Sequence, residues 1–203
     1  GEYVYDWDNS ASSPNLNGLS PGVYNITVTD SEGCTADASY IIDNPDVISV
    51  ISTPKDISCN GLTDGTIDLD VNGGTPDING EYIYEWSFGG TIFSTSQNLT
   101  GLSSGIYTVT VTDSNNCTFG PLDIEISEED EIVITLINKN DVSCNGGADG
   151  VINITVTGGV PDVNGEYVYD WDNSASSPNL NGLSPGVYNI TVTDSEGCTA
   201  DAS

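Results

Sequence analysis

The sequence contains no histidine and no methionine, and only two of its 203 residues are lysine or arginine. The missing histidine removes the commonest general base and the usual partner of a serine or cysteine nucleophile, so we do not expect an enzyme. With 31 acidic residues the net charge is −29, which repels nucleic acid and anionic lipid and excludes both as partners. No run approaches the roughly 20 apolar residues that span a bilayer, so no direct membrane insertion is expected.

The apolar residues that are present follow a regular pattern. They make up 36% of the chain, include ten tyrosines and three tryptophans, and fall in short runs that alternate with polar residues. A disordered acidic tail lacks such runs. The chain is therefore expected to fold, in spite of its charge.

Two blocks of the sequence are repeated. Residues Gly1–Ser39 recur without a change at Gly165–Ser203, and a divergent copy begins at Gly80. A second block begins at Lys55 and recurs from Asn140. Repeats of this length indicate tandem domains, each of which contacts mainly its neighbours.

Five segments between residues 45 and 129 alternate with the period of two that is typical of strands, and none has the period of a helix. In one of them Tyr107, Val109 and Val111 share a face while threonines take the other. Clusters of Gly, Asn, Asp and Pro separate the segments, which favours an all-β sandwich. The predicted strands are residues 47–52, 66–71, 82–86, 106–112 and 122–126.

Two residues narrow the sandwich to an immunoglobulin-like one. Trp86 is the single tryptophan of the third strand, and Tyr107 stands where a tyrosine corner belongs, with its hydroxyl bonded back to the preceding loop. The equivalent residues of the other copies are Trp7, Tyr24, Trp171 and Tyr188. Val109 replaces the second core cysteine of true immunoglobulin domains, so we expect a core closed by aliphatic packing.

The repeats and strands together predict tandem immunoglobulin-like domains arranged end to end. The boundaries are placed where acidic and prolyl residues separate apolar strands. We expect the C-terminal part of a first repeat at residues 1–44, a complete repeat at 45–129, and a third repeat, lacking its last strand, at 130–203.

Several ordered motifs resemble one known family. The sequence reads SCNG-x-x-DG, then GG-x-P, Y-x-Y-x-W, GL-x-x-G-x-Y-x-V-T-V-T-D and C-T. This order resembles the SprB repeat, which builds large gliding-motility adhesins on the surface of Bacteroidetes. An acidic insertion at 77–81 departs from the family pattern.

The resemblance implies a repeat segment of a bacterial cell-surface filament or adhesin stalk. It further implies export by type IX secretion, attachment to the outer membrane, and a role in gliding motility or surface attachment. The expected partners are neighbouring repeats of the same chain, while surface glycans or abiotic surfaces would be held by another region. The alternative is an array of carbohydrate-binding modules, in which one face of each domain recognises a glycan.

The five cysteines follow the repeats. Cys34, Cys117 and Cys198 come after the fourth strand of each copy, and Cys59 and Cys144 precede the second strand. At a cell surface such thiols form disulfides. One pairing lies within domains, Cys59 with Cys117 and Cys144 with Cys198, and leaves Cys34 over.

The strand order favours another pairing, between domains. The start of the second strand and the end of the fourth lie at opposite ends of a sandwich, roughly 20–25 Å apart, whereas disulfide Cα atoms lie within about 7 Å. In an end-to-end array Cys59 would face Cys198, and Cys117 would face a cysteine before residue 1. We expect this inter-domain lock to stiffen the array, and the within-domain pairing remains the alternative.

Two acidic loops are candidate calcium sites, because calcium prefers hard oxygen ligands. They present oxygens at alternating positions, and acidic linkers are expected nearby. The candidate ligands are Asp77, Asn79 and Glu81, their copies Asp162, Asn164 and Glu166, and the linker residues Glu128 and Asp130. Solvation of the surface is the ordinary role of such side chains, and calcium is the one candidate cofactor.

Overall fold

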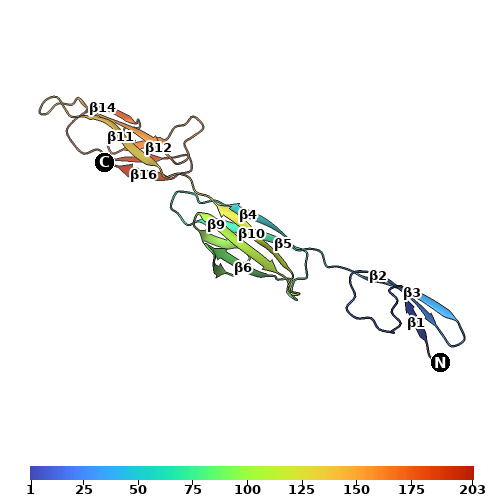
Figure 1. Cartoon of the computed structure of the whole chain (residues 1–203). Helices are drawn as coiled ribbons and strands as arrows, with labels where there is room; N and C mark the ends of the chain where they lie inside the picture. The colour runs from blue at the N-terminus through green and yellow to red at the C-terminus, as the bar shows by residue number, and fades with distance from the viewer.

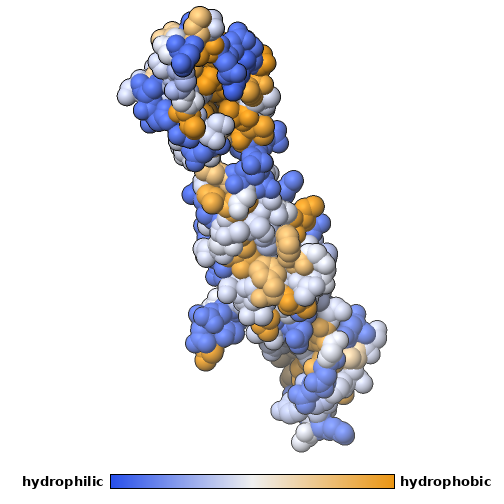
Figure 2. Space-filling view, turned by 90° about the vertical axis from the view of Figure 1, so that its left-hand side faces the viewer, coloured by the Kyte–Doolittle hydropathy of each residue, from blue (hydrophilic) through white to orange (hydrophobic).

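The computed structural model describes all residues from 1 to 203 and consists of β-strands and loops. The strands fall into three groups, which we call the first (residues 1–44), second (45–129) and third unit (130–203). The units follow one another in a row, with the termini in the two outer ones (Figure 1). Figure 2 shows the same three bodies, with apolar patches scattered among polar residues. The structure contains no helix that could span a membrane.

The second unit consists of two antiparallel sheets, with strand orders β4-β5-β8 and β10-β9-β6-β7. Its strands are β4 (Ser49–Lys55), β5 (Gly65–Asn72), β6 (Ile83–Phe88), β7 (Thr91–Ser94), β8 (Leu99–Leu102), β9 (Gly105–Thr112) and β10 (Thr118–Ile126). Buried residues of both sheets form a single core cluster, so the sheets pack face to face. This confirms the predicted class, tandem immunoglobulin-like β-sandwiches.

The core of the second unit comes from alternate residues of its strands. Ile67, Trp86, Val109 and Val111 are all 0% exposed. Side chains of a strand point alternately to its two faces, so the period of two in the sequence becomes one buried face. Burying each aliphatic side chain contributes about 1.5–3 kcal/mol. The Trp86 Nε1–H donates to the carbonyl of Ser96 at 2.8 Å, which satisfies its one polar atom.

A tyrosine ties each long strand to the loop before it. The Tyr107 hydroxyl donates to the carbonyl of Ser103 at 2.9 Å. The other units contain the same contact at 2.8 Å, from Tyr24 to Ser20 and from Tyr188 to Ser184. This is the geometry of a tyrosine corner, which fixes the loop at one end of the sandwich.

The third unit is a smaller sandwich of the same kind, with sheets β11-β12-β14 and β13-β15-β16. Its strands are β11 (Val133–Asn140), β12 (Gly150–Thr157), β13 (Val168–Trp171), β14 (Asn179–Leu183), β15 (Ile190–Thr193) and β16 (Thr199–Ala202). The short strand β16 pairs with β15 at the end of this unit. The predicted domain boundaries, with a third repeat that lacks its last strand, stay a prediction.

The first unit has only one sheet, of β1 (Val4–Trp7), β2 (Gly22–Thr29) and β3 (Thr35–Ile42). Its apolar face therefore borders an open groove of about 850 Å³. Val28 is only half-buried, whereas the equivalent Val192 of the third unit is 0% exposed. The same residues thus build a closed core only where a second sheet covers them.

Candidate functional site at the disulfide-linked junction

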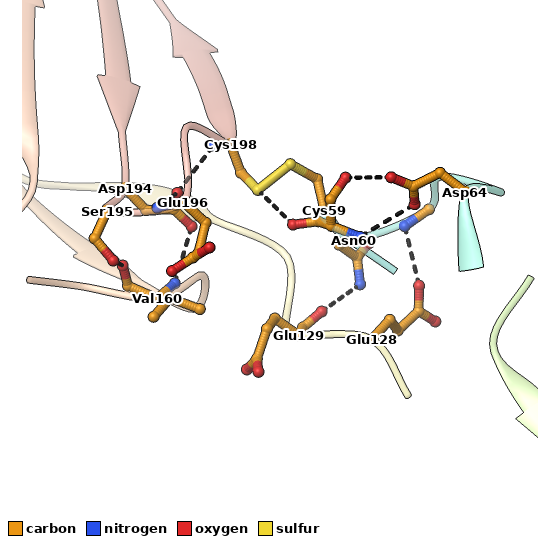
Figure 3. The surroundings of a disulfide bond; sticks show 12 residues. Cys59, Asn60, Asp64, Glu128, Glu129, Val160, Asp194, Ser195, Glu196 and Cys198 are labelled. Atoms are coloured by element: carbon orange, nitrogen blue, oxygen red, sulfur yellow. Dashed lines mark hydrogen bonds between the residues drawn. A yellow bond between two sulfur atoms is a disulfide. The ribbon is translucent and has the colours of Figure 1, made fainter. Parts of the chain in front are cut away.

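A disulfide joins the second unit to the third. It links Cys59 and Cys198, which are 139 positions apart in the sequence, with their Cα atoms 5.6 Å apart (Figure 3). Cys59 lies in the loop between β4 and β5, and Cys198 in the loop between β15 and β16. The bond therefore crosses the boundary between two sandwiches.

The strand order explains why these two cysteines meet. The loop before β5 and the loop after β9 lie at opposite ends of a sandwich, so Cys59 and Cys117 of one unit are kept apart. The within-domain pairing is not formed, and Cys34, Cys117 and Cys144 are free, exposed thiols. We call the end of a unit that carries the Cys59 type of loop, before the second strand, its tail. The opposite end, which carries the Cys117 type of loop, is its head.

The tail loop (residues 58–64) is held by an aspartate at its far end. The Asp64 carboxylate accepts the N–H of Ser58 at 3.1 Å and its hydroxyl at 2.6 Å. These bonds, the hydroxyl first, lower the pKa of Asp64 below its usual value. The N–H of Leu62 donates to the Cys59 carbonyl at 3.1 Å, so the cysteine lies on a closed turn.

The linker that follows the second unit lies against this tail loop. The Asn60 side-chain amide donates to the carbonyl of Glu129 at 2.8 Å, and the Gly61 N–H donates to the Glu128 carboxylate at 3.0 Å (Figure 3). The hydroxyl of Ser104 donates to the same carboxylate at 2.8 Å. The bond from Gly61, followed by that from Ser104, lowers the pKa of Glu128. The linker is thus fixed to the second unit before it enters the third.

The head loop (residues 194–198) is organised by a buried acidic side chain. Asp194 is 5% exposed, and its carboxylate accepts the N–H groups of Val160, Glu196 and Cys198 at 2.9, 3.0 and 2.9 Å. One carboxylate therefore connects the cysteine loop to the loop formed by residues 158–160 of the same head. Residues of both units line a cleft of about 470 Å³ at this junction.

The candidate calcium ligands have other contacts in the structure. Asp77 accepts the N–H groups of Asn79 at 2.9 Å and Glu81 at 2.8 Å, and the bond from Glu81 does most to lower its pKa. The copy formed by Asp162, Asn164 and Glu166 has the same turn.

The two candidate ligands in the linker, Glu128 and Asp130, form their hydrogen bonds with residues outside these turns. Glu128 holds the tail loop, and the carbonyl of Asp130 accepts the N–H of Gly159 at 2.7 Å. No group of three or more acidic or cysteine side chains lies close enough to hold a metal ion. The short acidic spacing is explained by turns whose aspartate accepts backbone N–H groups. Calcium binding stays a prediction, which a melting curve with and without chelator tests.

Sequence reasoning missed the aspartates that shape both loops. Their signal was present, since each tail cysteine is followed five residues later by an aspartate, Asp64 or Asp149. Each head cysteine is preceded by an aspartate four residues earlier, at Asp30, Asp113 or Asp194. An Asp side chain readily accepts the N–H groups of the turn that follows it, so this spacing indicates a capped cysteine loop.

Fold and junction together define a tandem β-sandwich repeat protein whose units are connected end to end. No curated protein matches the sequence. Among solved structures, it is similar to the three N-terminal domains of the highly immunogenic outer capsid protein (Hoc) of bacteriophage RB49, at 16% identity, over 99% of this chain and 84% of that one, with a TM-score of 0.49. It is also similar to the N-terminal eight Ig domains of Down syndrome cell adhesion molecule, at 12% identity, over 98% of this chain and 32% of that one, with a TM-score of 0.45.

A family model described as the SprB repeat matches residues 51–91 and 136–176. The two matched regions include Cys59 and Cys144 and the tail loops that carry them. Two regions of the chain therefore match the SprB repeat, which supports the predicted family.

Proposed function

We propose that the chain is a stalk segment of an adhesive filament on the bacterial cell surface, and that disulfides between consecutive units stiffen it. The bond between Cys59 and Cys198 carries this proposal. The linker already connects the two units, and the disulfide connects them at a second point. Two connections restrict the bending and twisting that a single linker permits.

The chemistry of the chain supports a surface location. Disulfides persist in oxidising compartments and are rare in the cytosol. Because SprB repeats occur in cell-surface proteins, we extend the proposal to type IX export, outer-membrane attachment and gliding motility.

The charge of the chain supports an extended shape. At physiological salt the Debye length is about 8 Å, so carboxylates on adjoining units still repel one another. With a net charge of −29, units resist folding back on each other and resist aggregation. The function assigned to the chain is mechanical, and no reaction is assigned to it.

A comparison of domain orientation by NMR tests the proposal. In the oxidised chain the second and third units are expected to share one alignment tensor, because they move as one body. In Cys59→Ser the tensors are expected to differ. Cys144→Ser is the matched control, since it removes a free thiol from the same motif. Shared tensors in Cys59→Ser, or separate tensors in the oxidised chain, would refute stiffening by the disulfide.

A further inference from the structure

The third unit carries a tail loop without a partner. Residues Ser143–Gly146 repeat the Ser-Cys-Asn-Gly sequence of Ser58–Gly61, and Asp149 stands where Asp64 stands in the second unit. The Cys144 thiol is free and exposed. The same motif that is engaged in one junction is therefore open at the end of the third unit.

This open loop already has the conformation of the engaged one. The N–H of Ser143 donates to Asp149 at 3.0 Å, and the N–H of Gly147 donates to the carbonyl of Cys144 at 2.9 Å. The equivalent bonds of the engaged tail loop both measure 3.1 Å. The hydrogen bonds from Ser143 also hold the pKa of Asp149 below its usual value. The loop is thus preorganised for a junction before any partner binds.

A matching head loop is present and free in the second unit. Asp113 is 2% exposed and accepts the N–H groups of Thr75, Asn115 and Cys117 at 2.9, 2.9 and 2.8 Å. The engaged head loop has the same three bonds, at 2.9, 3.0 and 2.9 Å. The Cys117 thiol is free and exposed. Both halves of a second junction therefore exist in the geometry that the first junction uses.

We propose that the tail of the third unit is a docking surface for the head of a further unit of the second kind, closed by a disulfide from Cys144 to the cysteine equivalent to Cys117. This inference rests on the proposed function and names the partner of that same site. The partner is of the second kind because residues 165–203 repeat 1–39, and 1–39 are followed by such a unit.

The backbone of that unit supplies the remaining contact. In the linker that leads into it, the residue equivalent to Pro45 takes the position of Glu129, and its carbonyl is expected to accept the side-chain amide of Asn145, as Glu129 accepts that of Asn60. A proline keeps its carbonyl although it has no N–H, so this contact is compatible with the substitution.

Closing the bond is an oxidation. The two thiols lose two protons and two electrons, and a disulfide oxidant such as glutathione disulfide takes them and becomes two glutathione thiols. Because the tail and head loops are preorganised, Cys144 is expected to pair with a head cysteine and not with another exposed thiol.

The test extends the full chain by a second copy of residues 40–129 after Ser203. Cysteines then increase from five to seven, and oxidation in a glutathione buffer is expected to leave three free thiols, as in the original chain. Peptide mapping is expected to recover Cys59 with Cys198, and Cys144 with Cys117 of the added copy. The added copy is ¹⁵N-labelled and joined by ligation, so that its peptides differ in mass from the identical peptides of the original residues. The original Cys117 is the matched control, because its sequence is the same but no tail precedes it.

Five free thiols, or a disulfide between the two cysteines of the added copy, would overturn the inference. A second variant, Asp149→Ala, removes the acceptor that shapes the tail loop. At a fixed concentration of reduced glutathione, this variant is expected to need about tenfold more glutathione disulfide to close the Cys144 bond, because the loop is no longer preorganised. Asp141→Ala is the control, since Asp141 makes only an exposed ion pair with Lys139. Equal closure in both variants would contradict docking.

The two proposals fail separately. Loss of the Cys144 bond with an intact, stiff Cys59–Cys198 junction would refute only the docking partner. Formation of both bonds with freely moving units would refute only the mechanical role.

Discussion

The Asp194 carboxylate lies 2.9 Å from the backbone nitrogen of Cys198 and accepts its N–H. The same carboxylate accepts two further N–H groups, from Val160 and Glu196. The cysteine that crosses the junction is therefore positioned by its own unit as well as by the disulfide. A head loop of this kind presents its thiol in one place, which favours one partner.

Replacing Asp194 by alanine is expected to weaken the third unit and its junction. Three N–H donors lose their acceptor, which costs about 1–3 kcal/mol in free energy of unfolding. The Cys59–Cys198 disulfide should also be reduced at lower dithiothreitol concentration. Urea unfolding and thiol titration measure the two effects.

The matched control is Asp113→Ala, which removes the same contact from a head whose cysteine is free. It should destabilise the second unit and leave the reduction of the disulfide unchanged. An unaltered disulfide in Asp194→Ala would show that the loop does not position Cys198.

Acid is expected to destabilise the second unit through Asp113. The N–H of Thr75, followed by those of Cys117 and Asn115, lowers the pKa of Asp113 from its usual 3.8. A lowered pKa in the folded state means that this carboxylate adds stability above pH 3.8 and loses it as the pH falls through the lower folded value. The melting temperature of the unit should therefore decrease below about pH 4.

Circular dichroism melts between pH 7 and pH 2 measure this loss. Asp113→Asn should lower the melting temperature at neutral pH and make it less sensitive to acid. Asp68→Asn, at an exposed position of β5, should keep the acid sensitivity of the parent chain. If a steep acid transition persists in Asp113→Asn, other carboxylates cause it.

The sequence predicts the strands whose side chains alternate over five residues or more. Residues 66–71 and 106–112 lie within β5 and β9, and residues 82–86 overlap β6. The short strands β7 and β8 were not predicted, because four residues are too few to show a period. In β8, Leu99 and Leu102 are buried although a glycine interrupts the segment, so packing against β5 determines its structure.

The junction was partly predictable. Opposite ends of a sandwich separate Cys59 from Cys117, and this follows from strand order alone. The contacts of Asn60 and Gly61 with the linker depend on how two units are oriented, which no pattern within one unit specifies. The N–H groups that Asp77 accepts could not be predicted either, because a turn closed by backbone N–H groups leaves the same acidic spacing in the sequence as a calcium loop does.

Ile67→Ala is expected to destabilise the second unit by about 2–5 kcal/mol, since it leaves a cavity in a closed core. Ile67 is 0% exposed, whereas Ile83 of the same unit is 64% exposed. The control Ile83→Ala should therefore change the free energy of unfolding by about 0.5 kcal/mol or less. Urea denaturation measures both, and equal effects of the two substitutions would contradict the assigned core.

The first unit is expected to become a closed sandwich when a second sheet is supplied. Placing a copy of residues 130–164 before Gly1 reproduces the arrangement of the third unit, in which the identical residues 165–203, which include β14, pack against β11 and β12. Trp7 should then be buried as Trp171 is, at 3% exposed. Amide hydrogen exchange in β2 should slow by about 100-fold or more, because opening of the strand would now expose a core.

The control for this addition is the same segment with Ile154→Asp. Ile154 is 7% exposed and belongs to the core of the third unit, so a carboxylate at its position in the added copy prevents packing. Exchange in β2 should then remain as fast as in the original chain. Equal protection by both segments would show that the apolar face of the first unit does not select a second sheet, and the groove beside Trp7 would need another explanation.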